Sequence, residues 1–267
     1  MPVYNKQLTK LNFNRNFRVG SSTWNSFESY TANVPATRLW IRESGGVFRD
    51  FGNYNSAQPT CTGATYLSTK GPNWRFPIQG LRPEYASATV PTRITLDDVR
   101  NFYPGYDQES TYETIISGWI KVDRYNAGGG SSGSSILEIS TASTKATVSE
   151  SNSYLSVFID SSGDFTIRFG DGTDWVKVTA QNNKLPPTGQ WFNFVVVVPD
   201  STNSTGEGEI SQADLASTKI YIDGRYTGTP TVAAQNSADL TVPSSGTYYA
   251  YIGYGMGEDN LSSMEGP

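Results

Sequence analysis

Alternating hydrophobic and polar positions dominate the C-terminal half of this chain. The clearest segments are residues 191–198 (WFNFVVVV), 219–224 (KIYIDG) and 251–255 (YIGYG). A period of two is the pattern of β-strands, and no segment shows the 3.6-residue period of a long helix. The pattern predicts an all-β protein in which two antiparallel sheets pack face to face.

Other segments extend this pattern along the chain. Strands are also expected at residues 37–43, 46–51, 112–122, 136–140, 154–160, 164–170 and 174–179. Residues 195–198 (VVVV) have no polar break, which predicts a central strand covered on both faces. Ser161-Ser162-Gly163 predicts a hairpin turn, and Asp223-Gly224 predicts a second turn with positive φ. Single helical turns are expected at 95–100 and around 211–215.

Composition narrows the possible functions. Only 36% of the 267 residues are hydrophobic, but 16 Tyr, 12 Phe and 6 Trp supply large side chains for a core. A net charge of −5 without a Lys/Arg cluster argues against nucleic-acid binding. No run of apolar residues is long enough for membrane insertion. The single cysteine, Cys61, has no partner for an internal disulfide, which favours synthesis in a reducing cytoplasm.

The chain contains no histidine. This excludes Ser-His-Asp and Cys-His nucleophile systems, HExxH zinc sites and histidine acid–base chemistry. Carboxylate pairs and Ser-Lys pairs remain open. The sequence therefore favours a protein that is not an enzyme.

Five segments in order resemble the concanavalin A-like, laminin G-type jelly roll over residues 91–257. They are 115–121 (IISGWIK), the strands around 161–163, the strand that begins at Trp191, KIYIDG with the following Tyr226 and Gly228, and YIGYG. The resemblance implies a sandwich of two curved antiparallel sheets, in which glycan or protein ligands bind the concave face or the rim loops. Some relatives are glycoside hydrolases with an E-x-D-x-x-E strand motif, and this chain contains no Glu-x-Asp.

The resemblance also implies candidate ligand sites. Several laminin G-type domains bind calcium at a rim, where Asp171 and Asp174 would supply oxygens, with Asp160 and Asp164 nearby in sequence. The alternative is that these aspartates belong to solvated hairpin turns. A sugar would need an exposed aromatic ring beside a polar group. The candidates are Trp175, next to Asp174, then Tyr226, and the cluster of Tyr248, Tyr249 and Tyr251, of which alternation sends at least some to the core; Trp175 is the first to test.

The first 90 residues mix arginine and aromatic residues without clean periodicity, and proline and glycine interrupt them. We expect this segment to dock on a partner, and residues 258–267 to form a flexible tail. Aromatic and arginine side chains are enriched at such surfaces. The candidate docking residues are Trp24, Tyr30, Trp40, Arg42 and Arg49.

Together these features resemble virion structural proteins of phages, such as decoration proteins and head or tail fibres. On this hypothesis the chain is made in the host cytoplasm and is a homo-oligomer in the virion. It contacts a major capsid or tail protein, and the sandwich stabilises the particle or binds host surface glycans. Two alternatives are open: a free carbohydrate-binding, lectin-like module, and a glycan-acting enzyme of unrecognised type.

Overall fold

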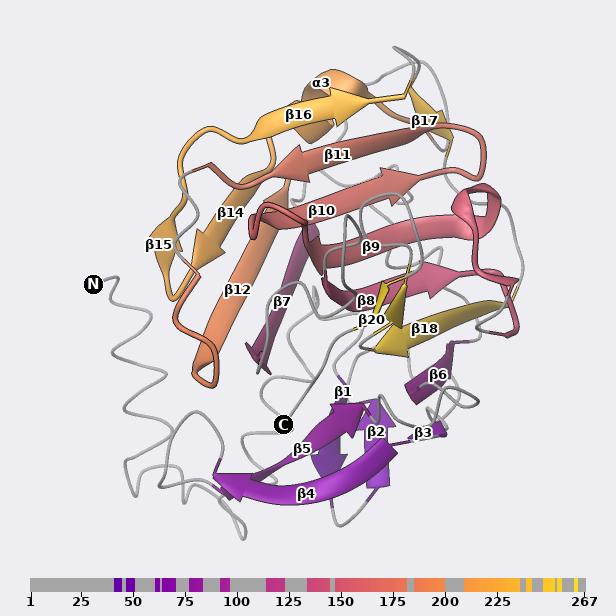
Figure 1. Ribbon diagram of the computed structural model, residues 1–267. Coiled ribbons are helices and arrows are strands. Elements are labelled where there is room, and N and C mark those ends of the chain that lie inside the picture. The colour runs from indigo at the N-terminus through magenta and orange to yellow at the C-terminus, as the bar shows by residue number, and fades with distance from the viewer. Residues whose placement is uncertain are drawn as a thin grey trace, which may run out of the picture. The chain divides into compact units, whose positions relative to one another are not determined.

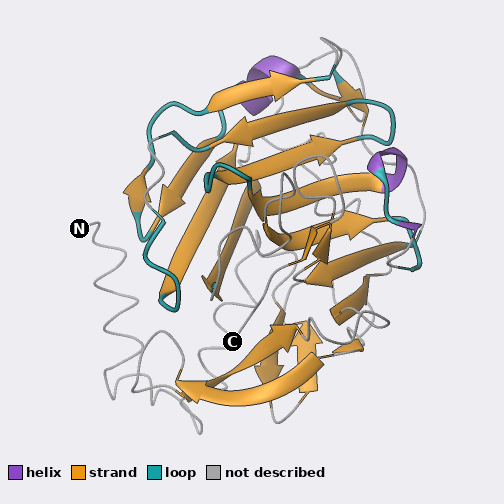
Figure 2. Cartoon of the chain, viewed as in Figure 1, coloured by secondary structure: helices purple, strands orange, loops and turns teal. Residues whose placement is uncertain are grey.

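The computed structural model describes most residues between 114 and 251. The gaps in this range are 123–133, 145–146, 182–184, 200–208, 236–238 and 242–246, and outside the range the model describes only the backbone of individual strands. The chain divides into two units, residues 1–58 and residues 59–267. The described elements are almost all strands (Figures 1 and 2). No helix in this described part is long and apolar enough to span a bilayer.

Two antiparallel sheets form the second unit. The eight-stranded sheet runs in the order β16 (Thr231–Ala234), β11 (Trp175–Thr179), β10 (Phe165–Gly170), β9 (Ser153–Ile159), β8 (Ser134–Ser140), β18 (Tyr248–Ile252), β6 (Thr92–Leu96) and β3 (Cys61–Thr62). The four-stranded sheet runs in the order β15 (Arg225–Tyr226), β14 (Lys219–Ile222), β12 (Trp191–Val198) and β7 (Thr114–Lys121). The predicted all-β sandwich of two antiparallel sheets is confirmed.

Smaller elements complete the second unit. They are the pairs β4 (Ala64–Lys70) with β5 (Pro77–Pro83), β13 (Glu209–Ile210) with β17 (Leu240–Thr241), and β19 (Tyr254–Gly255) with β20 (Ser262–Ser263), the 3₁₀ turn η4 (Glu150–Asn152) and the helix α3 (Gln212–Ala216). The helical turn predicted near residues 211–215 is confirmed, and Ser211 caps it by accepting a hydrogen bond from Asp214 N at 3.0 Å.

Two local predictions are corrected, and one hairpin was missed. Thr95 and Leu96 belong to β6 rather than to a helical turn, because they pair with Tyr249 and Tyr248 of β18. The strand expected at 251–255 is two strands, β18 and β19. The β4–β5 hairpin was not predicted because of its prolines, but these stand at the ends of β5, where a missing N–H is tolerated.

The core lies between the two sheets and uses every second residue of their strands. Phe192, Phe194, Val196 and Val198 of β12 are buried on one face of the four-stranded sheet. The rings of Phe194 and of Phe165, which lies on β10, are 5.2 Å apart between centroids. This contact joins the two sheets, and ring pairs of this kind add to the stability that burial alone provides.

Gly118 makes room for Phe194 at this contact. The two residues are directly opposed on β7 and β12, and a Cβ atom on Gly118 would lie 2.9 Å from Phe194 Cε1. The phenyl ring therefore lies over the glycine backbone. A larger residue at 118 would displace the ring that contacts the other sheet.

The four-stranded sheet is not covered equally on both faces, in contrast to the expectation for residues 195–198. Val196 and Val198 are fully buried, but Val195 and Val197 are only partly buried and point to the opposite face. The run of four valines reflects one core face and one apolar face that solvent reaches. In KIYIDG, the predicted alternation is confirmed, since Ile220 and Ile222 are buried and Tyr221 is not.

The first unit contains one described hairpin, β1 (Ile41–Ser44) with β2 (Val47–Asp50). Its register places Arg42 directly opposite Arg49. The other docking candidates, Trp24, Tyr30 and Trp40, lie outside the described residues. In the second unit, β3 and β6 belong to one sheet, so this sheet takes in residues on both sides of the boundary expected near residue 90.

We predict that Gly118→Ala destabilises the protein through Phe194. Overpacking a core contact of this kind costs about 1–3 kcal/mol in the free energy of unfolding. In a Phe194→Leu background the added methyl group has space, so the cost of Gly118→Ala should fall. Urea denaturation of the four proteins in this cycle measures the coupling; strictly additive effects would contradict the proposed contact.

Candidate functional site

A row of polar side chains crosses the eight-stranded sheet on the face opposite to the core. The register aligns Glu138 of β8, Ser156 of β9, Arg168 of β10 and Lys177 of β11. Directly opposed residues in antiparallel strands share a face, so these four define what we call the polar face. Glu138 and Ser156 are fully buried and Arg168 is 3% exposed.

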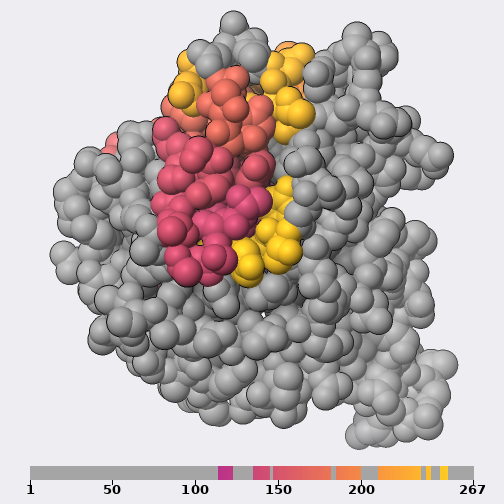
Figure 3. Space-filling view, turned by 90° about the vertical axis from the view of Figure 1, so that its right-hand side faces the viewer, coloured from indigo at the N-terminus to yellow at the C-terminus, as the bar shows by residue number. Residues whose placement is uncertain are grey.

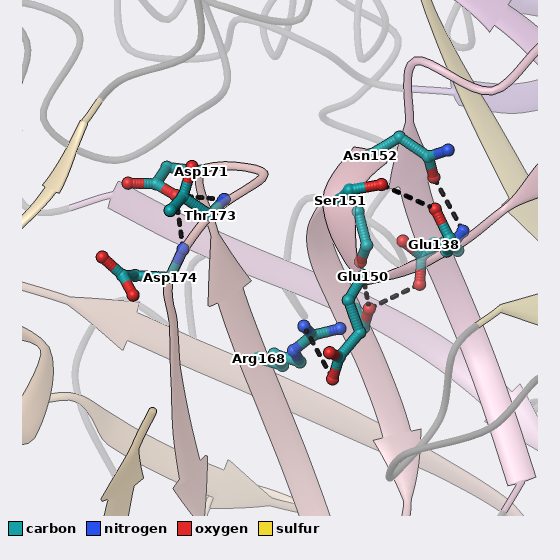
Figure 4. Close-up of polar contacts among 11 residues, drawn as sticks. Glu138, Glu150, Ser151, Asn152, Arg168, Asp171, Thr173 and Asp174 are labelled. Carbon is teal, nitrogen blue, oxygen red and sulfur yellow. Dashed lines mark hydrogen bonds and ion pairs between the residues drawn. The ribbon is translucent and has the colours of Figure 1, made fainter. Parts of the chain in front are cut away.

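Hydrogen bonds connect part of this row. The Ser156 hydroxyl donates to a carboxylate oxygen of Glu138, and the hydroxyls of Ser153 and Ser156 are 3.2 Å apart. Figure 4 shows Arg168 directed toward Glu150 of η4, and the Nη2–Oε1 distance is 3.6 Å. Burying charged groups is costly unless they are bonded, so these contacts hold the polar face in one arrangement.

Trp175 stands at the end of the polar face, where β11 begins. It is opposite Gly170 and two residues before Lys177, so its side chain lies on the same face as Lys177. Lys177 Nζ is 4.6 Å from the indole centroid and Arg168 Cζ is 5.6 Å from it, both within cation–π range. Glu150, Arg168, Trp175 and Lys177 are called the Trp175 cluster below.

The turn at residues 171–174 sets the position of this cluster. Asp171 Oδ1 accepts hydrogen bonds from Thr173 N and Asp174 N, each at 2.7 Å, and its Oδ2 accepts one from Thr241 N at 3.2 Å. Gly172 has φ +91°, and a Cβ atom there would lie 2.9 Å from Ser151 O. The turn is therefore seated against the backbone of η4, which carries Glu150.

The loop at residues 141–152 forms the neighbouring part of the rim. Asn152 organises it, because its Oδ1 accepts from Ser149 N at 2.8 Å and from the Ser140 hydroxyl at 3.0 Å. Tyr251 fixes the loop to the sheet, because its hydroxyl donates to Ala142 O at 2.6 Å. Figure 3 looks onto this side of the protein, where the described segments between residues 140 and 175 form a continuous surface.

Tyr154 connects the loop and the turn. Burial raises the pKa of its hydroxyl, and the negative charge of Asp171 raises it further, against a smaller opposite effect of a hydrogen bond with the Thr141 side chain. The hydroxyl therefore stays protonated at neutral pH. Stability linked to this raised pKa is complete below about pH 10, the ordinary tyrosine pKa, and is lost as pH rises through the higher value in the folded protein.

The structure brings together three of the four predicted ligand-binding residues. Asp171, Asp174 and Trp175 lie in or beside one turn, whereas Tyr226 lies on β15 in the other sheet. There its ring packs against Tyr221 with 5.5 Å between centroids. Tyr226 therefore contributes nothing to the Trp175 cluster.

Arg168, Lys177 and Glu150 were not predicted as site residues. A signal for two of them was present, because a hairpin that turns at 171–174 pairs Arg168 with Lys177 and Gly170 with Trp175. Glu150 gave no such signal, since its loop contact with Arg168 depends on the fold of residues 141–152.

Two of the four aspartates expected to hold calcium, Asp160 and Asp171, have carboxylates engaged in turns. Asp171 bonds as described above, and Asp160 Oδ1 accepts from Ser162 N at 2.9 Å and Asp164 N at 2.8 Å. Within the described ranges, no three His, Cys, Asp or Glu side chains group as metal ligands. The geometry favours the turn interpretation of these aspartates over the calcium hypothesis.

Comparisons with known proteins identify no family. The sequence matches no protein-family model, and no curated protein is similar to it. One similar solved structure is domain 4 of AbnA, a GH43 extracellular arabinanase from Geobacillus stearothermophilus, in complex with arabinotriose. Its sequence is 14% identical, and the match covers 86% of this chain and 89% of that domain with a TM-score of 0.43.

Two toxin binding domains are also similar in structure. The binding domain of Paraclostridial Mosquitocidal Protein 1 is 11% identical over 86% of this chain with a TM-score of 0.47, and that of botulinum neurotoxin serotype G is 11% identical over 85% with a TM-score of 0.37. The match covers 48% and 46% of those two chains, respectively. At these TM-scores the similarities carry no inference about function.

We predict that Asp171 acts through its turn. Asp171→Ala removes the acceptor of the Thr173 and Asp174 amides, which solvent reaches at least in part, and should lower the free energy of unfolding by about 0.5–1.5 kcal/mol. Asp171→Asn keeps a side-chain oxygen and should retain most of the stability. Calcium or EDTA should leave the melting temperature of the unsubstituted protein unchanged; a rise with calcium that Asp171→Asn abolishes would instead indicate a metal ligand.

Proposed function

We propose that this chain is a non-catalytic carbohydrate-binding protein and that a sugar ring stacks on Trp175. The observation that carries this proposal is the partly exposed indole of Trp175, set among charged side chains at the rim of a β-sandwich. Aromatic rings offer an apolar surface for the flat face of a sugar, and a few polar groups then fix its orientation.

The surroundings of Trp175 suit such a role. Arg168 is buried beside the indole and forms an ion pair with Glu150, so it restricts where the ring can lie. Lys177 is partly exposed, and its ammonium group lies over the indole, 4.6 Å from the ring centroid. This side chain has to swing aside when a sugar stacks on that face, and its ammonium group then donates to a sugar hydroxyl at the edge of the ring. A ring held by its neighbours loses little conformational freedom when a ligand binds.

The carboxylates near the cluster favour binding over catalysis. Glu138 is fully buried and accepts from Ser156, Glu150 pairs with Arg168, and Asp171 bonds the amides of its own turn. A retaining glycosidase needs two carboxyl groups about 5 Å apart on either side of the bond that is cleaved. The described contacts give these three carboxylates roles in structure.

The virion hypothesis concerns where such a module is carried, and it stays a prediction. It rests on the resemblance noted from the sequence and on the docking candidates among residues 1–90. Mass spectrometry of purified particles from the source of the chain is the direct measurement. Finding the chain only as a free protein would contradict the virion role and leave the sugar-binding proposal intact.

Trp175→Ala should weaken glycan binding by roughly 10- to 100-fold, the range typical of a central aromatic contact residue. A glycan array first identifies a bound glycan, and isothermal titration with that glycan as a soluble oligosaccharide then gives the affinity. Tyr226→Ala is the matched control, because Tyr226 is an exposed aromatic on the other sheet and should have no effect.

The melting temperature of each variant checks that the fold is kept. Equal losses for Trp175→Ala and Tyr226→Ala, or a loss for Tyr226→Ala alone, would contradict the assignment to Trp175. Absence of binding to any arrayed glycan would contradict the proposed function itself.

A further inference from the structure

The four-stranded sheet has an apolar surface on the side away from the core. Among the residues whose side chains are described, the large hydrophobic residues that are exposed are Ile115 (63%), Trp119 (55%) and Tyr226 (48%). The register places all three on one face of this sheet, which we call the outer face, together with the partly buried Val195 and Val197. Exposed apolar residues that gather on one face mark an interaction surface.

We propose that the outer face binds a second copy of this chain. The first argument is charge. Lys121 of β7 is opposite Trp191, and Asp223 follows β14 with its carboxylate bonded to Asn193 N at 3.0 Å. Trp191 and Asn193 are two residues apart on β12, so Lys121 and Asp223 lie at the same end of the outer face, on opposite sides of β12.

A two-fold axis turns this arrangement into complementary pairs. In this arrangement the outer faces of two copies are opposed, and the two-fold axis lies between the two sheets, parallel to β12. Because β12 lies between β7 and β14, the axis places β7 of one copy over β14 of the other. Lys121 then meets the partner's Asp223, and symmetry forms the pair twice. The same axis brings Trp119 toward the partner's Tyr221 and Tyr226, whose rings already pack together. Facing sheets whose strands run in nearly the same direction are an ordinary mode of sheet packing.

The second argument is area. With strands about 4.8 Å apart and a rise of about 3.4 Å per residue, the described strands give a flat footprint of roughly 350 Å² per copy. The relief of the side chains increases this, so two copies approach the total of about 1,000 Å² that a specific interface needs. This is the size of a weak, concentration-dependent dimer rather than an obligate one.

Sedimentation velocity of the full chain across roughly 1–500 µM tests the proposal. The expected result is a monomer–dimer equilibrium that Trp119→Lys weakens by at least about tenfold, because it places a charge within the apolar contact. Ala233→Lys is the control, since it adds the same charge at an exposed position of β16 in the other sheet. If Trp119→Lys does not fold, Ser117→Arg serves at an exposed position on the same face.

A double-mutant cycle tests the geometry of the dimer. Lys121→Met keeps the aliphatic stem, and Asp223→Asn keeps both the turn and the acceptor for Asn193 N. Each should raise the dissociation constant of the dimer, and the double variant should raise it no further than the larger single effect.

Three results would overturn the proposal: a monomer at every concentration, equal effects of Trp119→Lys and Ala233→Lys, or additive effects in the cycle. A monomer that binds glycan through Trp119 would likewise replace the second copy with a sugar ligand. Loss of the dimer with intact glycan binding at Trp175 would separate this proposal from the proposed function.

Discussion

The contact between Phe165 and Phe194 is the point on which the sandwich depends. The rings belong to different sheets and lie 5.2 Å apart, and Phe194 reaches this position because Gly118 opposite it has no side chain. A chain with only 36% hydrophobic residues has to concentrate them at alternate positions of a few strands. The main core then lies between the sheets, a small cluster of Ala142, Val148 and Tyr251 lies apart from it, and each sheet keeps a second face with its own chemistry.

The faces of the two sheets that point away from the core differ in chemical character. The eight-stranded sheet carries a bonded polar row, in which Glu138 and Arg168 are buried, whereas the four-stranded sheet exposes Ile115 and Trp119. Buried charges need partners in fixed positions, which favours a rigid rim around Trp175. Covering exposed apolar side chains removes apolar surface from water, which favours association between copies. The proposed sugar-binding surface and the proposed contact between copies therefore lie on different sheets of one small domain.

Much of the fold was predictable because strand alternation is a local property. Residues 191–198 form a strand with the predicted bounds. Asp223 and Gly224 have positive φ, as predicted, with values of 48° and 73°. The predictions failed where pairing partners decide the structure. Thr95 has a helix-capping sequence, but pairing with Tyr249 makes it part of a strand. The run of valines at 195–198 suggests a strand covered on both faces. Their neighbours on β7 show otherwise, because Ile115 and Ser117 are exposed on the face of Val197 and Val195.

The candidate site was harder to predict, because an aspartate in a loop can serve either a turn or a metal site. What distinguishes them is the direction of the carboxylates. In this chain Asp160, Asp171 and Asp223 each accept backbone amides of nearby turns or strands, so they do not point to a common centre. Each bond restricts a loop, and the loop restrained by Asp171 is the one that presents Trp175. The acidic residues thus act on the candidate site through geometry, and the aromatic ring is the surface that we propose for the ligand.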